Sequence, residues 1–277
     1  MEFNVSKFLD DYPVQKLAKE EEDDFIKQLI KSSKGALNKI GKPNPLFQGR
    51  EEEISAVRES LAKKRMRNCI LVGDAGIGKT EIAKRALKNC GDIVLSVDAY
   101  MLQANCTLVG MFEQKVFDIL SPIANRNKGN NRYITLFVDE IHVLWQIGKN
   151  EFAGTVAFGD IIKPYLSDGS ITIIGATTKA EYDKIIKKDK ALLRRLPPIF
   201  IKGMADDETF KIVKSFGKKA LSDDVCRKIV EESKKVTYLN NPDCSLEIAD
   251  RVIARGVTTG CVPEEGDVEQ IVSLMVE

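Results

Sequence analysis

The amino-acid sequence predicts a three-layer α/β domain with a parallel sheet of five strands, followed by a small all-helical domain. Five short runs rich in Val, Ile and Leu recur between residues 68 and 203, with helical segments between them. Such runs are typical of parallel strands that helices cover on both faces. After Met204 no further run of this kind occurs, and four helical patterns follow. A covered sheet and then a helical lid account for both observations.

Residues 1–44 are expected to form a helical N-terminal extension. They are rich in Lys, Glu and Asp, and Phe25, Ile26, Leu29 and Ile30 recur at the spacing of an amphipathic helix. The sequence GKPNP ends this pattern. The next segment, REEEISAVRESLAKKR, again has helical spacing, so a helix should lead into the first strand.

The strands and the later helices follow in a regular order. The strands are expected at the runs NCILVG, DIVLSVD, YITLFVD, SITIIGA and PIFIKG. The helices of the C-terminal part are expected at about 206–217, 222–236, 244–255 and 264–276. We therefore divide the chain into an extension at 1–44, an α/β nucleotide-binding domain at 45–203 and a helical lid domain at 204–277.

Composition restricts the classes of function. A chain of 277 residues with 43% apolar composition can bury a core, and a formal charge of +1 gives no global electrostatic case for nucleic acid. The six cysteines form no C-x-x-C pair and His142 is the only histidine, so neither a zinc site nor a disulfide framework is indicated. No signal peptide and no membrane-spanning apolar run is present, so we expect a cytoplasmic protein without a membrane partner.

Residues 73–80, GDAGIGKT, match the phosphate-loop pattern G-x-x-x-x-G-K-[ST]. The loop follows a strand and opens a helix, so backbone N–H groups and the positive helix end can face a phosphate. Lys79 is predicted to reach the β- and γ-oxygens of ATP, and the Thr80 hydroxyl to bind Mg²⁺. The expected nucleotide contacts of this segment are Asp74, Ala75, Gly76, Ile77, Gly78, Lys79, Thr80 and Glu81.

The third strand run ends in Asp139 and Glu140. Ligands of a parallel sheet sit at the carboxyl ends of its strands, so these acids should meet the same nucleotide as the phosphate loop. Successive side chains of a strand point in opposite directions, so the two acids can do different work. Asp139 is predicted to hold Mg²⁺ through its water shell, and Glu140 to orient and deprotonate the attacking water.

Two further pairs are candidates for catalysis. Thr177 and Thr178 end the fourth run, where a hydroxyl can contact the γ-phosphate or the water, although Thr178 can instead cap the next helix. Arg194 and Arg195 precede the fifth run, about 20 Å from their own nucleotide if a strand of six residues separates the two. They are predicted to act on the phosphates of a neighbouring subunit, the alternative being solvated surface residues.

The order of phosphate loop, strand with DE, strand with ATT, arginine pair and helical lid resembles the AAA+ ATPases. From about Asn44 to the C-terminus, the chain is similar to the first ATPase module of the Clp/Hsp100 protein-remodelling ATPases. The segments that carry this likeness are PLFQGREEEI, DEIHVL, KPYLSDGSITIIGATTKAEYD, KDKALLRRL and YLNNPDCSLEIADRVI.

The resemblance implies a ring, usually of six subunits, that binds ATP between subunits and pulls a protein segment through its centre. It also implies roles for individual residues. These are Phe47 and Gln48 near the adenine, Ile212 against the base, Thr177 or Thr178 as the first sensor, and Arg194 with Arg195 as trans-acting arginine fingers.

The chain departs from the family pattern in three places. The candidate pore loop has Thr107, Leu108 and Val109 before Gly110, where the family has a basic residue, an aromatic residue and a second basic residue. Leu108 offers a smaller contact than an aromatic ring, so threading is expected to be weak, substrate-specific or absent. Cys244 replaces a lysine of the lid helix. We expect a single ATPase module without a peptidase-docking tripeptide.

The sequence therefore predicts an Mg²⁺-dependent ATPase that forms rings and remodels a protein partner chosen by residues 1–44. Two alternatives stay open. A nucleic-acid-associated loader or motor would use the basic run Lys63, Lys64, Arg65 and Arg67, which otherwise forms a solvated helix end. A regulatory scaffold would use its nucleotide state to control assembly without threading.

Overall fold

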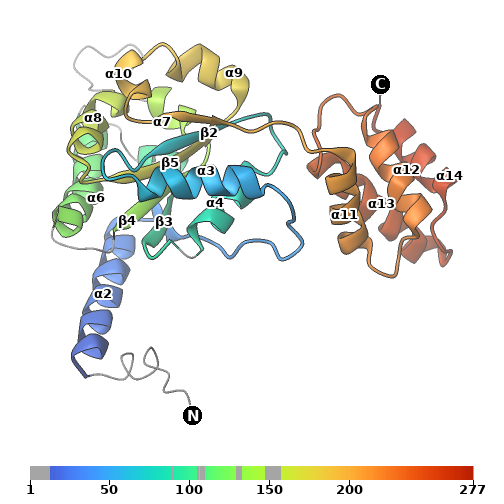
Figure 1. Cartoon of the computed structure of the whole chain (residues 1–277), viewed down its shortest axis with the longest axis horizontal. Helices are drawn as coiled ribbons and strands as arrows, with labels where there is room; N and C mark the ends of the chain where they lie inside the picture. Colours follow the sequence, from blue (N-terminus) through green and yellow to red (C-terminus); the bar gives the residue numbers. More distant parts are fainter. Residues whose placement is uncertain are drawn as a thin grey trace.

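The computed structural model describes residues 13–88, 90–104, 106, 110–128, 133–146 and 157–276. These residues form an α/β body around a six-stranded sheet and a group of four helices to one side of it (Figure 1). The strands are β1 (Leu37–Lys39), β2 (Cys69–Val72), β3 (Ile93–Val97), β4 (Ile134–Val138), β5 (Thr172–Thr177) and β6 (Pro198–Phe200). The helices of the body are α2 (Pro13–Ser32), α3 (Glu51–Ala62), α4 (Lys79–Leu87), α5 (Ala99–Gln103), α6 (Met111–Lys128), α7 (His142–Gln146), α8 (Phe158–Asp168), α9 (Lys179–Glu181), the π-helix η1 (Tyr182–Ile186) and α10 (Lys190–Leu193).

The strands lie in the order β1-β3-β4-β5-β2-β6. The five runs predicted from the sequence are β2 to β6, and they pair in parallel, which confirms the predicted sheet. The sixth strand, β1, was not predicted. It pairs antiparallel with β3, with Leu37 opposite Val97, and lies inside the segment that we expected to be a helical extension. Three residues with one buried side chain are too few to produce a strand pattern.

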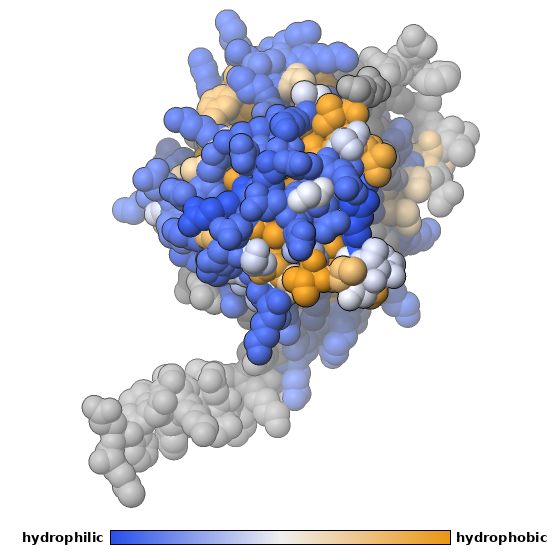
Figure 2. Space-filling view, turned by 90° about the vertical axis from the view of Figure 1, so that its right-hand side faces the viewer, coloured by the Kyte–Doolittle hydropathy of each residue, from blue (hydrophilic) through white to orange (hydrophobic). Residues whose placement is uncertain are grey.

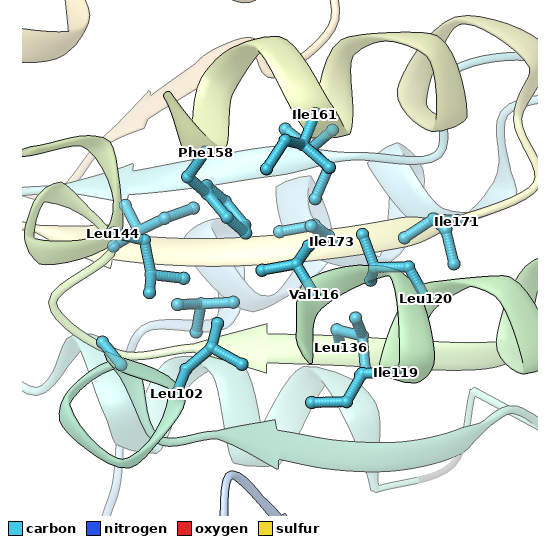
Figure 3. Packing of buried hydrophobic residues seen from close by; sticks show 14 of the residues in the cluster. Leu102, Val116, Ile119, Leu120, Leu136, Leu144, Phe158, Ile161, Ile171 and Ile173 are labelled. Atoms are coloured by element: carbon cyan, nitrogen blue, oxygen red, sulfur yellow. The ribbon is translucent and has the colours of Figure 1, made fainter. Parts of the chain in front are cut away.

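Alternation of side chains along the central strands creates a hydrophobic core on each face of the sheet. Ile70 and Val72 of β2 belong to the cluster beneath α6 and α8, whereas Cys69 and Leu71 belong to the opposite cluster. Figure 3 shows the first cluster, with Val116, Ile119 and Leu120 of α6 and Phe158 and Ile161 of α8 over the residues of β4 and β5. Burial on both faces explains the continuous apolar runs.

Helices α3 and α4 cover the opposite face. Ile82, Ala83 and Ala86 are fully buried on α4, and Val57 and Leu61 anchor α3 in the same cluster. Because α4 packs directly against the sheet, the loop that opens it is held at the carboxyl end of β2.

The lid consists of four helices that have a hydrophobic cluster of their own. They are α11 (Asp206–Gly217), α12 (Asp223–Ser233), α13 (Asp243–Thr259) and α14 (Glu265–Ser273), close to the predicted ranges. Val213, Ile229, Ile248, Val252 and Val268 are among the buried residues that join these helices. Viewed from its outer side, the lid is mostly hydrophilic with smaller hydrophobic areas (Figure 2). The boundaries at residues 44 and 203 stay predictions.

Among the residues that the structure describes, no helix is long and apolar enough to cross a membrane.

Candidate functional site

The phosphate-loop sequence forms a tight turn between β2 and α4 that requires glycine. Gly76 and Gly78 have φ angles of 77° and 94°, in the left-handed region that favours glycine. A Cβ on Gly73 would lie 2.7 Å from the carbonyl oxygen of Ile201, so no side chain fits there. The glycines that define the motif are therefore explained by backbone geometry.

Lys79 is folded onto its own loop. Its Nζ donates hydrogen bonds to the carbonyl oxygens of Gly73 and Asp74, at 2.9 and 2.8 Å. Burial lowers the pKa of the Lys79 amine, while the nearby carboxylates of Glu140 and Asp139 act in the opposite direction. A charged amine donates a stronger hydrogen bond to an anion than to a neutral carbonyl oxygen. Lys79 therefore favours a negatively charged ligand in this loop.

Thr80 and Asp139 meet where α4 begins and β4 ends. The Thr80 hydroxyl donates to Asp139 Oδ2 at 2.7 Å, and the backbone N–H of Glu140 donates to Asp139 Oδ1 at 3.1 Å. A hydroxyl beside a carboxylate provides the hard oxygen donors that Mg²⁺ prefers. In the described ranges no group of three or more His, Cys, Asp or Glu side chains could hold a metal ion. Mg²⁺ at a phosphate site needs few protein ligands, so the pair fits such an ion.

Glu140 and Thr177 both contact the side chain of His142. The Glu140 carboxylate is about half exposed, and its Oε2 lies 3.2 Å from His142 Nδ1. The same nitrogen lies 3.1 Å from the hydroxyl oxygen of Thr177, which is fully buried. Thr178 instead caps α9, since its hydroxyl accepts a hydrogen bond from Glu181 N. Of the two candidate sensor residues, only Thr177 contacts this group.

A cleft of about 410 Å³ opens beside these residues, a size that suits a small-molecule ligand. Its lining residues from the phosphate loop, the strand ends and the lid are Asn44, Leu46, Phe47, Ala75, Gly76, Gly78, Lys79, Thr80, Glu81, Asp139, Glu140, Ile212, Phe216, Pro242, Asp243 and Leu246. The lining includes the polar side chains of Lys79, Thr80 and the two acids. It also includes apolar side chains from the loop before α3 and from the lid, which suit a flat base.

Several predicted residues lie outside this lining. Gln48 donates to Ser215 Oγ at 2.9 Å and so ties the loop before α3 to α11 of the lid. The Asp74 side chain is exposed, and Ile77 is buried beneath the loop in the cluster of α3 and α4. The expected position of Gln48 near the adenine base of the nucleotide stays a prediction.

The sequence reasoning missed several of the apolar side chains that line the cleft, which together we call the apolar slot. The slot consists of the predicted residues Phe47 and Ile212 and of four that were not predicted, Leu46, Phe216, Pro242 and Leu246. Phe216 stands four residues after Ile212 on one helix, and this spacing is a signal that could have identified it. Leu246 has no comparable local signal, because it reaches the slot only when α13 packs beside the loop.

Two sets of contacts that sequence reasoning also missed hold the cleft together. Asn240 Nδ2 donates to the carbonyl oxygen of Ala75 at 3.1 Å, and Asp243 N donates to that of Gly76 at 3.3 Å. From α4, the Arg85 guanidinium donates to the carbonyl oxygen of Phe47 at 2.7 Å and lies over its ring. Asn240 and Asp243 thus tie the lid to the phosphate loop, and Arg85 ties the segment that carries Phe47 to α4.

The arginine pair divides into two different environments. Arg195 donates to Ser167 Oγ at 2.5 Å and to the carbonyl oxygen of Ala191 at 2.6 Å, so its side chain is held by its own subunit. The Arg194 side chain is exposed, and it makes no hydrogen bond or ion pair within the described part of the chain. Neither arginine lines the cleft.

Other candidate features lie apart from the cleft. The pore-loop residues Thr107, Leu108 and Val109 fall outside the described residues, and Gly110, with a φ of 86°, directly precedes α6. A larger hollow of about 830 Å³ beside α8 and α10 is lined by four lysines and contains none of the predicted site residues. We therefore place the functional site at the smaller cleft.

Comparison with known proteins agrees with this geometry. Residues 69–203, from β2 to the end of the α/β body, match the family model of the AAA ATPases, the "ATPase family associated with various cellular activities". The chain is 32% identical to the chaperone protein ClpB of Aquifex aeolicus over 289 aligned residues, which cover 94% of this chain. The chain is an AAA+ protein of the Clp/Hsp100 family.

Further relatives and solved structures are similar to this AAA+ chain but are longer than it. It is 31% identical to ClpB of Mycoplasma pneumoniae over 84% of this chain. A cryo-EM structure of Hsp104 in its closed state, with ATPγS and FITC-casein, superposes with a TM-score of 0.73 at 26% identity over 89% of this chain. The Saccharomyces cerevisiae Hsp104–ADP complex gives a TM-score of 0.68. The AAA+ chain spans 28% of the Aquifex protein and 45% of the first Hsp104 chain.

Proposed function

We propose that this chain binds ATP with Mg²⁺ in the cleft, hydrolyses ATP to ADP and phosphate, and acts as one module of a protein-remodelling ring, with six as the expected number of subunits. The observation that carries the proposal is the convergence of Lys79, Thr80, Asp139 and Glu140 on one cleft whose lining also contains apolar side chains. Membership in the Clp/Hsp100 family supports the same function.

Each residue group has a distinct task in the proposed reaction. The loop N–H groups and Lys79 hold the phosphates, and Phe47, Ile212, Phe216 and Leu246 enclose the base. Thr80 and Asp139 are the residues that would hold Mg²⁺, which supplies charge neutralisation on the phosphates when bound. Glu140, half exposed at the cleft, accepts a proton from the attacking water.

The ring supplies the group that a single subunit lacks. Among the residues that the structure describes, no arginine lines the cleft, yet phosphoryl transfer gains much from a cation on the developing charge. The Arg194 side chain is exposed and makes no hydrogen bond or ion pair within the described residues, so we assign it as the finger that acts on a neighbour. Arg195 is held by Ser167 and Ala191 and orients the segment that carries Arg194.

The alternative as a nucleic-acid motor loses part of its basis. Arg67, the last cation of the basic run, pairs with Asp92 at 3.0 Å and lies over the ring of Tyr133. Its role is therefore structural, and three exposed cations are left on a short segment.

The test measures steady-state hydrolysis by the full chain with Mg²⁺-ATP, and molecular mass in solution with and without nucleotide. Glu140→Gln should retain ATP binding and lower kcat by about 10²- to 10⁴-fold, the usual contribution of a general base. Casein serves as the unfolded-protein probe. If the wild-type chain hydrolyses no ATP, the ATPase proposal is wrong. If hydrolysis occurs but casein changes neither rate nor mass, the protein-remodelling part of the proposal is overturned.

A further inference from the structure

The contact between Glu140, His142 and Thr177 has a role that neither the phosphate loop nor the Mg²⁺ pair supplies. We propose that His142 is a positioning residue, whose Nδ1 connects the Thr177 hydroxyl to the Glu140 carboxylate and holds Glu140 in the orientation for proton abstraction. This inference rests on the proposed ATPase function. It assigns a task to the only histidine of the chain.

The contact has a defined polarity. An ionised carboxylate only accepts hydrogen bonds, so a favourable contact with Glu140 at 3.2 Å requires a hydrogen on His142 Nδ1. Thr177 Oγ1, 3.1 Å from the same nitrogen, then serves as a second acceptor. The hydroxyl hydrogen of Thr177 consequently remains available to donate to another acceptor, such as a phosphate oxygen. One imidazole thus fixes the carboxylate and leaves the hydroxyl as a donor.

Glu140 needs such a restraint because its own backbone provides little. Its φ angle is 49°, a left-handed value that a residue with a Cβ rarely adopts, and its side chain is 45% exposed. In the described part of the chain, His142 is the one side chain that pairs with its carboxylate. Without that contact, a half-exposed glutamate samples several rotamers, and only some of them face the cleft.

The other end of the contact is rigid. Thr177 has no exposed surface and ends β5 in the centre of the sheet. The backbone N–H of Ile141 donates to the carbonyl oxygen of Ala176 at 2.9 Å, which fixes the turn beside Thr177. Ile141 also fills the space above Gly175, where a Cβ would lie 2.7 Å from Ile141 Cδ1. His142 therefore projects from a hydrogen-bonded turn and connects a buried hydroxyl to a half-exposed carboxylate.

Folding does not depend on the imidazole. Helix α7 is anchored by Leu144 and Trp145, both fully buried, and by the edge contact of the Trp145 ring with Phe158. The His142 side chain is 15% exposed and lies at the first position of that helix. Variants at this position should consequently fold and bind nucleotide.

The test compares three substitutions in the full chain. His142→Phe keeps a ring and removes the donor. His142→Asn places an amide nitrogen where Nδ1 stood, whereas His142→Gln places its amide nearer the position of Nε2. For each variant, kcat and KM for ATP are measured with the affinity for a fluorescent ADP analogue, alongside wild type, Thr177→Val and Glu140→Gln.

We expect His142→Phe to lower kcat by about 10- to 100-fold, part of what a general base contributes, with KM changed by no more than about twofold. His142→Asn should recover most of the lost kcat, and His142→Gln should not. Thr177→Val should lower kcat in the same manner. The double variant His142→Phe/Thr177→Val should be no slower than the slower single variant, because both substitutions break one contact chain.

An unchanged kcat in His142→Phe overturns the inference, as does a double variant whose losses multiply. If His142→Phe fails to bind nucleotide, the pair of amide variants decides, and equal rates for Asn and Gln overturn the inference. The two proposals remain separable. A wild-type chain without hydrolysis ends both, whereas an active wild type, an inactive Glu140→Gln and an unaffected His142→Phe end only this one.

Discussion

Thr80 and Asp139 stand 59 residues apart in the sequence, and the hydroxyl of the first donates a hydrogen bond of 2.7 Å to the carboxylate of the second. This contact joins the start of α4, a helix that covers one face of the sheet, to the end of β4, a strand within that sheet. It brings the phosphate loop and the acidic strand end into one site. The backbone of these two elements therefore places side by side the two oxygens that we propose as ligands of Mg²⁺.

Removal of the Thr80 hydroxyl tests that arrangement. Thr80→Val keeps the shape of the side chain and should lower the ATPase rate by about tenfold or more at limiting Mg²⁺, because an oxygen ligand is lost. Thr80→Ser keeps the oxygen and is the matched control. The measurement is the ATPase rate as a function of Mg²⁺ concentration. Equal Mg²⁺ dependence in the two variants would show that the hydroxyl does not serve the ion.

Gly76 tests the junction between the phosphate loop and the lid. Gly76→Ala should weaken ATP binding by about tenfold, or about 1.4 kcal/mol, because a Cβ there would lie 2.9 Å from that of Asp243. Gly260→Ala is the control, since Gly260 has a similar φ of 71° but a Cβ added to it would meet no atom within 4 Å. It should cost about 1 kcal/mol of folding free energy and leave affinity intact. Equal affinities would argue against the junction.

The two arginines are expected to differ in an assembled ring. Arg194→Ala should leave nucleotide affinity and thermal unfolding unchanged while it abolishes most ATP turnover, because its cation acts on a neighbour. Arg195→Ala should also lower the thermal unfolding temperature, since its contacts with Ser167 and Ala191 are lost. Mixing Arg194→Ala with Glu140→Gln subunits should restore partial turnover. Failure of every mixture to do so would contradict action between subunits.

The cysteines should respond differently to pH. Burial raises the pKa of Cys69 to about 12 and that of Cys244 to about 11, whereas Cys261 is exposed. At pH 8 a thiol reagent should label Cys261 in the folded chain and leave the other two unreacted, as mass spectrometry of the digested protein will show. Rapid labelling of Cys69 without denaturant would contradict its burial.

The raised thiol pKa values also predict the direction in which the free energy of unfolding changes with pH. An unfolded thiol ionises near its ordinary pKa of 9.0, whereas the folded state retains the proton on Cys69 up to about pH 12. The folded state therefore binds more protons between these values, and the free energy of unfolding falls as pH rises above 9. Cys69→Ala should show a smaller decrease across this range in denaturant titrations, and an identical decrease would assign the effect to other groups.

Local patterns determined which features the sequence could predict. The five parallel strands are continuous apolar runs, and the phosphate loop and the pair Asp139 and Glu140 are contiguous motifs, so each was visible along the chain. The four lid helices were recognisable by their spacing for the same reason.

Features made by packing were not visible. Strand β1 is a strand only because β3 offers it an edge, with Leu37 opposite Val97. Leu246 joins Phe47 at the apolar slot through the approach of the lid, which no local pattern encodes. His142 was noted only as the single histidine, because its partner Thr177 lies 35 residues away.

Both borders of the sheet are closed to strand addition. On one side β1 is three residues long and ends in Lys39, and on the other β6 begins with Pro198, which lacks a backbone donor. Copies of this chain are thus poorly suited to joining their sheets through backbone hydrogen bonds, the route by which exposed strands polymerise into fibrils. We therefore expect subunits to associate through side chains, so that substitutions can change the partners and the geometry of association without disturbing the sheet.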